Sequence, residues 1–263
     1  MVAAGREPAK PRSRAPGFEL SEVRMCGRYS ITTDPEALRR LFRIDVFLNL
    51  IPRWNVAPTQ EVPVVRNGDP KAGEPAGRQL HVMRWGLVPS WAKDIGIGAK
   101  LINARAETVN EKPAFRGAFR YRRCLVPADG FYEWKAEAGR KQPWRVVRRD
   151  RAPFAMAGLW EVWEGTGEGS WLETFSIVTT EATAVIADIH DRMPVMLFEE
   201  QQFATWLDGT PQEAGALLGP CDPEAIEAYR VGPRVGNVRN DDAALIEPLD
   251  APAPPAASQG SLF

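Results

Sequence analysis

Alternation of apolar and polar residues predicts that much of the chain forms β-strands. Residues 61–66 and 79–85 both alternate with a period of two, and in the second His81, Met83 and Trp85 would share one face of a sheet. Further strands are expected over 26–31, 101–108, 124–131, 132–135, 144–149, 153–160 and 171–180.

Three segments carry the signals of short helices. Residues 34–42 open with Asp34 and Pro35 and repeat apolar residues on one face, which is typical of a capped amphipathic helix. Residues 199–207 and 211–218 show similar periods. Residues 53–60 and 235–240 are too rich in proline, glycine, asparagine and other polar residues for regular elements, so we expect loops there, the second near a site.

The two ends of the chain have no hydrophobic period. Residues 1–24 mix Arg, Lys, Pro and Ala, and we expect either a disordered extension or a start assigned upstream of the true one at Met25. Residues 250–263 begin as a run of Ala, Pro and Ser, which predicts a disordered tail. The folded unit is therefore expected to span 25–249.

Composition narrows the class of protein. The chain has 263 residues, of which 44% are apolar and 25% charged, with a net charge of −1, which is typical of a soluble globular protein and not of a general polyanion binder. The three cysteines, Cys26, Cys124 and Cys221, are widely spaced, which argues against a disulfide framework or a structural metal site. Without a membrane-length apolar run or a secretory signal, a cytoplasmic monomer is expected.

One stretch of the chain is locally basic. Residues 112–123 contain five basic residues with Phe115, Phe119 and Tyr121 between them, and no acidic residue. Basic side chains neutralise phosphates while aromatic rings stack on bases, so this stretch suits single-stranded or junction DNA. The alternative is a solvated basic face over a few core aromatics. Trp85 and Trp91, around a Gly and a Pro, likewise suit either a packed corner or a platform for bases.

Cys26 would be chemically unusual if it were the first residue of the mature chain. Its α-amine and thiol could then attack one aldehyde carbon and close a five-membered ring. An α-amine has a pKa of roughly 7.7–8.0, so an appreciable fraction is a neutral nucleophile at neutral pH. Otherwise, a cysteine beside a glycine is usually a small buried residue.

Two other residues are candidates for proton transfer. Glu133 lies between Tyr132 and Trp134, and a carboxylate among aromatic rings is poorly solvated, which raises its pKa. His190 is one of only two histidines, and a lone histidine is more often structural than catalytic, although the adjacent Asp191 and Arg192 favour a polar site.

Seven motifs in this order resemble the SOS response-associated peptidase (SRAP) family, the abasic-site shielding proteins. They are Cys-Gly-Arg-Tyr at 26–29, Asn-Val-Ala-Pro at 55–58, Trp-Gly-Leu-Val-Pro-Ser-Trp at 85–91, Asn-Ala-Arg-Ala-Glu-Thr at 103–108, Gly-Phe-Tyr-Glu-Trp at 130–134, His-Asp-Arg-Met-Pro at 190–194 and Val-Gly-Asn-Val at 235–238. The resemblance implies a single α+β domain around a curved, barrel-like antiparallel sheet with peripheral helices, and a basic cleft for single-stranded or junction DNA.

The resemblance also implies a chemistry and the residues for it. The N-terminal cysteine would form a thiazolidine crosslink with an abasic site, without metal or organic cofactor, after removal of an initiator methionine or autocatalytic cleavage of a leader. Cys26 matches the nucleophile, Asn103 the residue that orients it, Glu133 the acid/base and His190 the group that assists sugar opening. The DNA-binding residues implied by the resemblance or by the basic stretch are Arg28, Pro58, Trp85, Trp91, Arg105, Arg116 and Arg192.

Two rival functions and one further partner stay open at this stage. The rivals are a cysteine peptidase or amidohydrolase that uses Cys26, His190 and Glu133 on an acyl substrate, and a DNA-binding module without chemistry. The last five residues, with Gln259, Leu262 and Phe263, resemble the peptide by which bacterial replication proteins dock on the sliding clamp. Clamp docking would place the protein at the nucleoid and its replication forks.

Overall fold

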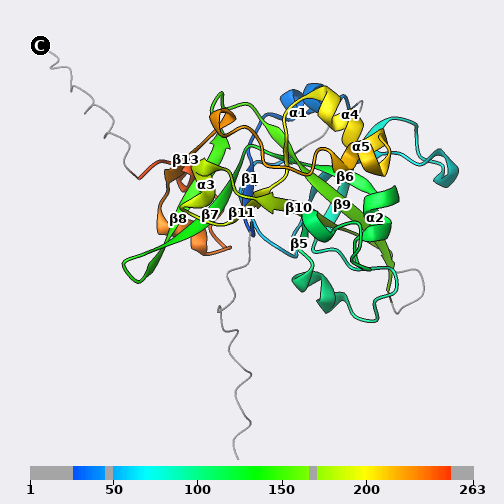
Figure 1. Ribbon diagram of the computed structural model, residues 1–263, viewed down its shortest axis with the longest axis horizontal. Coiled ribbons are helices and arrows are strands. Elements are labelled where there is room, and N and C mark those ends of the chain that lie inside the picture. Colours follow the sequence, from blue (N-terminus) through cyan, green and yellow to red (C-terminus); the bar gives the residue numbers. More distant parts are fainter. Residues whose placement is uncertain (1–25, 45–49, 166–170, 250–263) are drawn as a thin grey trace, which may run out of the picture.

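The computed structural model describes residues 26–44, 50–165 and 171–249, and it combines two systems of strands with short helices (Figure 1). In this view one half of the molecule carries β7, β8 and β13, and the other carries β6, β9 and β10 with α2. The predicted extension 1–24 and tail 250–263, including Gln259, Leu262 and Phe263, lie outside the described residues.

The first strand system is a five-stranded antiparallel sheet in the order β13-β8-β7-β1-β2. Its strands are β1 (Tyr29–Ile31), β2 (Arg53–Val56), β7 (Gly130–Glu137), β8 (Arg140–Arg148) and β13 (Ile226–Arg230). The short β1 joins β7 through Tyr29 opposite Phe131, and it joins β2 through Tyr29 opposite Val56.

The second strand system is a closed barrel. Its strands follow one another as β10-β4-β3-β6-β9, and β9 pairs again with β10 to close the ring. The bounds are β3 (Glu61–Asn67), β4 (Arg78–Trp85), β6 (Arg123–Ala128), β9 (Phe154–Glu164) and β10 (Trp171–Glu181). Three short strands, β5 (Asn103–Arg105), β11 (Arg192–Pro194) and β12 (Met196–Leu197), extend it. The predicted α+β class with a barrel-like sheet is therefore confirmed.

The barrel is mixed, since β10 runs parallel to both β4 and β5. A parallel pair needs a long connection between its strands, and β6 to β9 occupy that connection here. The all-antiparallel expectation therefore misses two pairings, both of which involve β10.

The helices lie outside the strands. They are α1 (Pro35–Phe42), α2 (Arg116–Tyr121), α3 (Ala184–Ala187), α4 (Glu200–Asp208) and α5 (Pro211–Gly215). Asp34 caps α1 by accepting from the Glu36 and Ala37 amides, as the sequence predicts. Short 3-10 helices occur at η1 (Pro70–Ala72), η2 (Ile95–Lys100), η3 (Ala106–Thr108), η4 (Pro223–Ala225), η5 (Pro233–Gly236) and η6 (Ala243–Ile246).

Two segments differ from the sequence prediction. In place of a loop over all of 53–60, Arg53–Val56 is strand β2, because its backbone pairs with β1 and Asp241 accepts from the Trp54 and Asn55 amides. The strand expected over 101–108 is limited to Asn103–Arg105, after which η3 begins.

The core lies inside and between the two strand systems. Trp85 and Trp206 are its largest fully buried side chains, and each indole nitrogen donates to a carbonyl, Trp85 to Ile102 and Trp206 to Cys124. Burying an indole without leaving its N–H unpaired removes the main cost of placing tryptophan in a core. Among the described helices, none is long and apolar enough to cross a membrane.

Candidate active site

Cys26 and Glu133 meet where β1 begins and β7 passes beside it. The backbone nitrogen of Cys26 donates to Oε1 of Glu133 at 2.7 Å, although the two residues are 107 positions apart. Both side chains are fully or almost fully buried. The group that would become the α-amine of a processed chain is therefore already placed against a carboxyl group.

Burial dominates the electrostatics of this pair. It raises the pKa of Glu133 to about 8, with a further rise from the charge of Asp191, while the hydrogen bond from Cys26 lowers it. Burial, and then the neighbouring Glu133, also raise the pKa of the Cys26 thiol well above its usual value. At neutral pH, Glu133 is thus suited to deliver and take up protons, and Cys26 is a thiol rather than a thiolate.

Asn103 approaches the same cysteine from the barrel. It opens β5 opposite Ile177 of β10, and its Nδ2 donates to the carbonyl oxygen of Cys26 at 3.4 Å. An orienting role for Asn103 requires a contact of this kind, and the role itself stays a prediction. Through it, the five-stranded sheet and the barrel both contribute to one site.

His190 lies between α3 and β11, and the charge of its neighbour Asp191 acts on the carboxyl group of Glu133. The Arg192 amide donates to Nδ1 of His190 at 3.0 Å, and an amide N–H is always a donor, so the neutral ring carries its proton on Nε2. Asp191 Oδ1 is also 3.0 Å from Nδ1, but its side chain is 85% exposed and solvated. Burial lowers the pKa of His190, so it is a neutral Nε2–H donor at neutral pH.

Arg28 is held at the edge of the site by oxygen atoms that carry no full charge. Its guanidinium donates to Oδ1 of Asn55 at 2.8 Å and to the carbonyls of Val235 at 2.6 Å and Gly236 at 3.3 Å, and it lies 5.9 Å from the ring centroid of Trp134. Within the described part of the chain it forms no ion pair with a carboxylate. Its positive charge therefore remains available to a phosphate.

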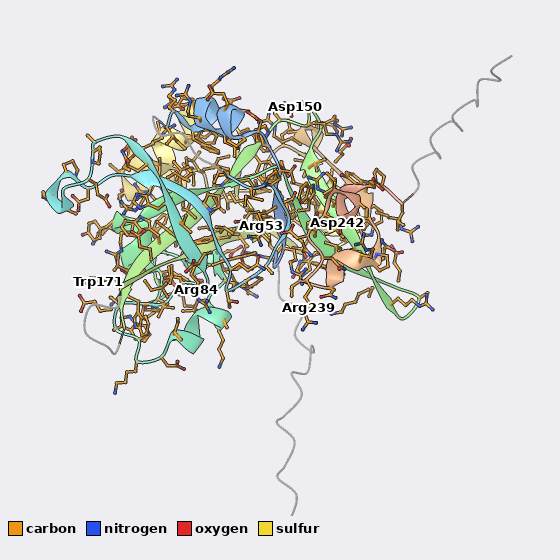
Figure 2. All side chains as sticks on the ribbon, turned by 180° about the vertical axis from the view of Figure 1, so that it is seen from behind. Arg53, Arg84, Asp150, Trp171, Arg239 and Asp242 are labelled. Carbon is orange, nitrogen blue, oxygen red and sulfur yellow. The ribbon has the colours of Figure 1, made fainter. Side chains whose placement is uncertain are left out.

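Asn55 organises this edge, a role that sequence reasoning missed. It is fully buried, and its Nδ2 lies 2.8 to 3.2 Å from the carbonyls of Val235, Asn237 and Asn240. Figure 2 labels Arg53 of β2, Arg239 and Asp242 on the side of the molecule that faces away from the viewer in Figure 1. The position of Asn55 at the start of the Asn-Val-Ala-Pro motif was the sequence signal that could have identified it.

Arg192 differs from Arg28 because a carboxylate already neutralises it. Both of its terminal nitrogens pair with Glu107, at 2.9 Å for Nη2, and Nη2 also donates to the Thr179 carbonyl at 2.7 Å. Glu107 has a lowered pKa, chiefly through this pairing and in smaller part through the charge of Arg105. Arg105 itself is exposed. Glu107 is a second residue of the site to which the sequence pattern assigned no role.

The remaining expected DNA contacts differ in accessibility. Trp91 is 60% exposed and could stack on a base, and Pro58 is half-buried beside Thr59, whose amide donates to the Trp85 carbonyl. Trp85 is fully buried, so its expected place as a stacking residue is corrected to a core position that shapes the site from within. Arg116 lies on α2, outside the cluster around Cys26.

The polar groups gathered at Cys26 are a carboxyl group from Glu133 and an amide from Asn103, with the imidazole of His190 on the neighbouring segment. Among the described residues, no group of three or more His, Cys, Asp or Glu side chains is arranged to hold a metal ion. A nucleophile, a proton carrier and a hydrogen-bond donor are the parts that addition to a carbonyl carbon requires.

Comparisons with known proteins agree on one family. The sequence profile of the family described as SOS response associated peptidase (SRAP) matches residues 25–238. The abasic site processing protein YoqW of Bacillus subtilis (strain 168) is 41% identical over 230 residues, which covers 85% of this chain and 99% of that protein. The abasic site processing protein HMCES of Gallus gallus is 32% identical over 230 residues, covering 77% of this chain and 68% of that protein.

Solved structures share the fold. A crystal structure of a protein from Bacteroides thetaiotaomicron superposes with a TM-score of 0.74 at 28% identity, covering 85% of this chain and 99% of that chain. A second, from Bordetella bronchiseptica, has a TM-score of 0.67 at 25% identity and covers 79% of this chain and 100% of that chain.

Proposed function

The chain belongs to the SOS response associated peptidase (SRAP) family, and from that membership and the contacts of Cys26 we propose that it captures abasic sites in single-stranded DNA as a covalent crosslink. The observation that carries the proposal is the 2.7 Å hydrogen bond from the Cys26 nitrogen to Glu133, supported by the approach of Asn103 to the same residue. YoqW and HMCES, both named abasic site processing proteins, support the substrate class.

The chemistry begins when Cys26 has a free α-amine. The amine attacks the C1′ aldehyde of the ring-opened sugar, and loss of one water gives a Schiff base. The thiol then adds to the Schiff-base carbon, its proton returns to the nitrogen, and a thiazolidine results without oxidation or reduction. Glu133, with its raised pKa, relays protons between amine, water and thiol, and the Nε2–H of His190 assists opening of the sugar by donating to its ring oxygen.

The same geometry suits removal of the residues before Cys26. The nitrogen that donates to Glu133 is the leaving group of the Met25–Cys26 peptide bond, so a protonated Glu133 is placed to protonate it while the thiol attacks the carbonyl carbon. Water then releases the acyl group from sulfur. The net reaction consumes one water and leaves the aminothiol that the crosslink needs.

A crosslinking experiment tests the proposal. The purified full chain is mixed with uracil-containing single-stranded DNA after glycosylase treatment, and adducts are separated on a denaturing gel and weighed by intact mass. We expect a stable adduct whose protein part begins at Cys26. Cys26→Ala should give none, and Cys26→Ser should give an adduct only after borohydride reduction, because a hydroxyl traps the Schiff base less well than a thiol does. Cys221→Ala is the matched control, and full crosslinking by a chain that retains Met1 would contradict the mechanism.

The rival enzyme, a cysteine peptidase acting on acyl substrates, fits the site less well. Such enzymes lower the pKa of the nucleophilic cysteine through a neighbouring imidazolium, whereas burial raises the pKa of Cys26 and lowers that of His190. An acyl-enzyme would also turn over, while the proposed adduct persists. A DNA-binding module without chemistry predicts that Cys26→Ala leaves the outcome at an abasic site unchanged.

Docking on the replication sliding clamp through Gln259, Leu262 and Phe263 extends the proposal to replication forks. Deleting residues 259–263 should abolish capture of the purified chain by immobilised clamp and leave crosslinking of free oligonucleotides unchanged. Capture that survives the deletion would contradict the docking role.

A further inference from the structure

A groove of about 720 Å³ lies between α2 and α5, at the end of the barrel away from β13 (Figure 1). Its walls combine arginines, amides and aromatic or aliphatic side chains. The lining residues that carry the argument are Glu107, Arg116, Arg120 and Tyr121.

The structure divides the basic stretch 112–123 between the protein interior and this groove. Arg122 pairs with Glu161 at 2.6 Å, and Arg123 is buried and donates to backbone carbonyls, among them that of Phe119. Arg116 and Arg120 line the groove and, within the described residues, form no ion pair with a carboxylate. Two positive charges therefore face a space that an anion can enter.

The aromatic residues of this stretch divide in the same way. Phe115 and Phe119 are buried in the core. Tyr121 is 73% exposed at the end of α2, lines the groove, and has the Arg120 guanidinium 5.9 Å from its ring centroid. An exposed ring beside two unneutralised arginines is suited to stack on a base whose flanking phosphates bind the arginines.

Glu107 connects this groove with the candidate active site. It lines the groove and pairs with Arg192, whose backbone amide in turn fixes His190. The groove therefore lies next to the segment that carries His190. A strand that leaves the site past Arg192 would reach the groove at Glu107.

We infer that this groove binds the nucleotides on one side of the abasic site, with their phosphates on Arg116 and Arg120 and a base stacked on Tyr121. The inference rests on the proposed function for the identity of the strand. The groove is separate from the residues that react, so it contributes affinity and direction and takes no part in bond formation.

Binding measurements with an unreactive lesion test this inference apart from the chemistry. Single-stranded oligonucleotides carry a tetrahydrofuran abasic analogue, which has no aldehyde, and are lengthened one nucleotide at a time on the 5′ or the 3′ side only. For the unmodified chain we expect the dissociation constant, read by fluorescence anisotropy, to fall with lengthening on one side. For the longest oligonucleotide, the dissociation constant of the double variant R116A/R120A should be at least about tenfold higher than that of the unmodified chain. It should be at least about fivefold higher for Tyr121→Ala and unchanged for Tyr121→Phe.

The control is R140A/K141A, which removes two exposed basic residues at the turn of the β7–β8 hairpin, away from the groove. It should bind every oligonucleotide like the unmodified chain, and R116A/R120A should bind the shortest one equally well. The inference would be overturned if affinity rose with oligonucleotide length equally in R116A/R120A and in the unmodified chain. It would also be overturned if poly-glutamate displaced the labelled oligonucleotide as effectively as the unlabelled oligonucleotide does. Failure of the proposed function would give a different result. No crosslink would form with a reactive abasic site, while affinity for the unreactive analogue would still rise with oligonucleotide length.

Discussion

At the residue scale, the protonation of Glu133 has a consequence for stability. Its pKa is about 8 in the folded protein and about 4.3 in an unfolded chain. As pH rises from about 4.3 to about 8, the unfolded chain loses this proton and the folded protein keeps it, so the contribution of Glu133 to stability is fully present below about pH 4.3 and is lost towards pH 8. A residue placed for proton transfer therefore destabilises the fold at neutral pH.

Because Glu133 lowers the free energy of unfolding at neutral pH, we expect Glu133→Gln to stabilise the protein while removing its activity. The comparison is made in a Cys26→Ala background, which keeps the preceding residues attached. Relative to the glutamine variant, the free energy of unfolding should fall by up to about 1.4 kcal/mol per pH unit between about pH 5 and 8. Urea denaturation at several pH values measures the difference. Glu137→Gln on the same strand is the control, and a difference that does not depend on pH would refute the assignment.

Glu107 gives a second prediction at this scale. Because it neutralises Arg192, a DNA phosphate must displace it before binding there. Glu107→Gln should therefore tighten binding of tetrahydrofuran-containing single-stranded DNA by about threefold to tenfold at low salt, an effect that fades as salt screens the charges. Glu227→Gln, which breaks the comparable pair with Arg151 far from the site, should change nothing. Weaker binding by Glu107→Gln would show that the carboxylate instead positions Arg192 productively.

At the element scale, strand β2 and the segment 233–241 form one edge of the site. Asp241 accepts from Arg53 at 2.6 Å and from the Asn55 amide at 3.1 Å, and Asn55 donates back to three carbonyls of the segment. Composition predicts the loop near a site at 235–240, but it also predicts a loop at 53–60, where β2 forms. Pattern and composition describe neighbours along the chain, whereas β2 exists in part because of Asp241, which lies 186 positions from Asn55.

Asn55→Ala should loosen this edge as a unit. It removes a donor from the carbonyls of Val235, Asn237 and Asn240 and one acceptor of Arg28. The Val235 carbonyl keeps Arg28 and the Asn237 carbonyl keeps the Asn240 amide, so we expect the free energy of unfolding to fall by about 2 kcal/mol. DNA affinity should fall in the variant that remains folded at low temperature, because Arg28 loses its fixed position. Chemical denaturation and anisotropy measure the two effects. Asn67→Ala, which removes one exposed hydrogen bond to Asp208, should cost no more than about 0.5 kcal/mol.

At the scale of the whole molecule, the candidate site lies where the two strand systems meet. Cys26 directly precedes β1 and Glu133 lies on β7 of the five-stranded sheet. Asn103 lies on β5 and His190 directly precedes β11, and both of these strands pair with β10 of the barrel. The sequence motifs supplied these four residues as candidates, and the family resemblance implied the fold class. They could not supply the parallel pairing of β5 with β10, the burial of Trp85 or the pairing of Arg192 with Glu107, since each depends on which strands close the barrel.

The charge distribution of the whole chain predicts how binding responds to salt. With a net charge of −1, the molecule has no general attraction for polyanions, so phosphates must meet individual arginines. Arg28, Arg105 and Arg192 at the site, with Arg116 and Arg120 in the groove, allow about five contacts. Each contact to a single strand contributes about −0.7 to the slope of log K against log salt, so the slope should be about −3.5, and about −2 in R116A/R120A. Anisotropy titrations between roughly 50 and 300 mM salt measure both values. A slope more negative than about −6 that is the same in R116A/R120A would mean that the strand binds over a broad surface instead of along these arginines.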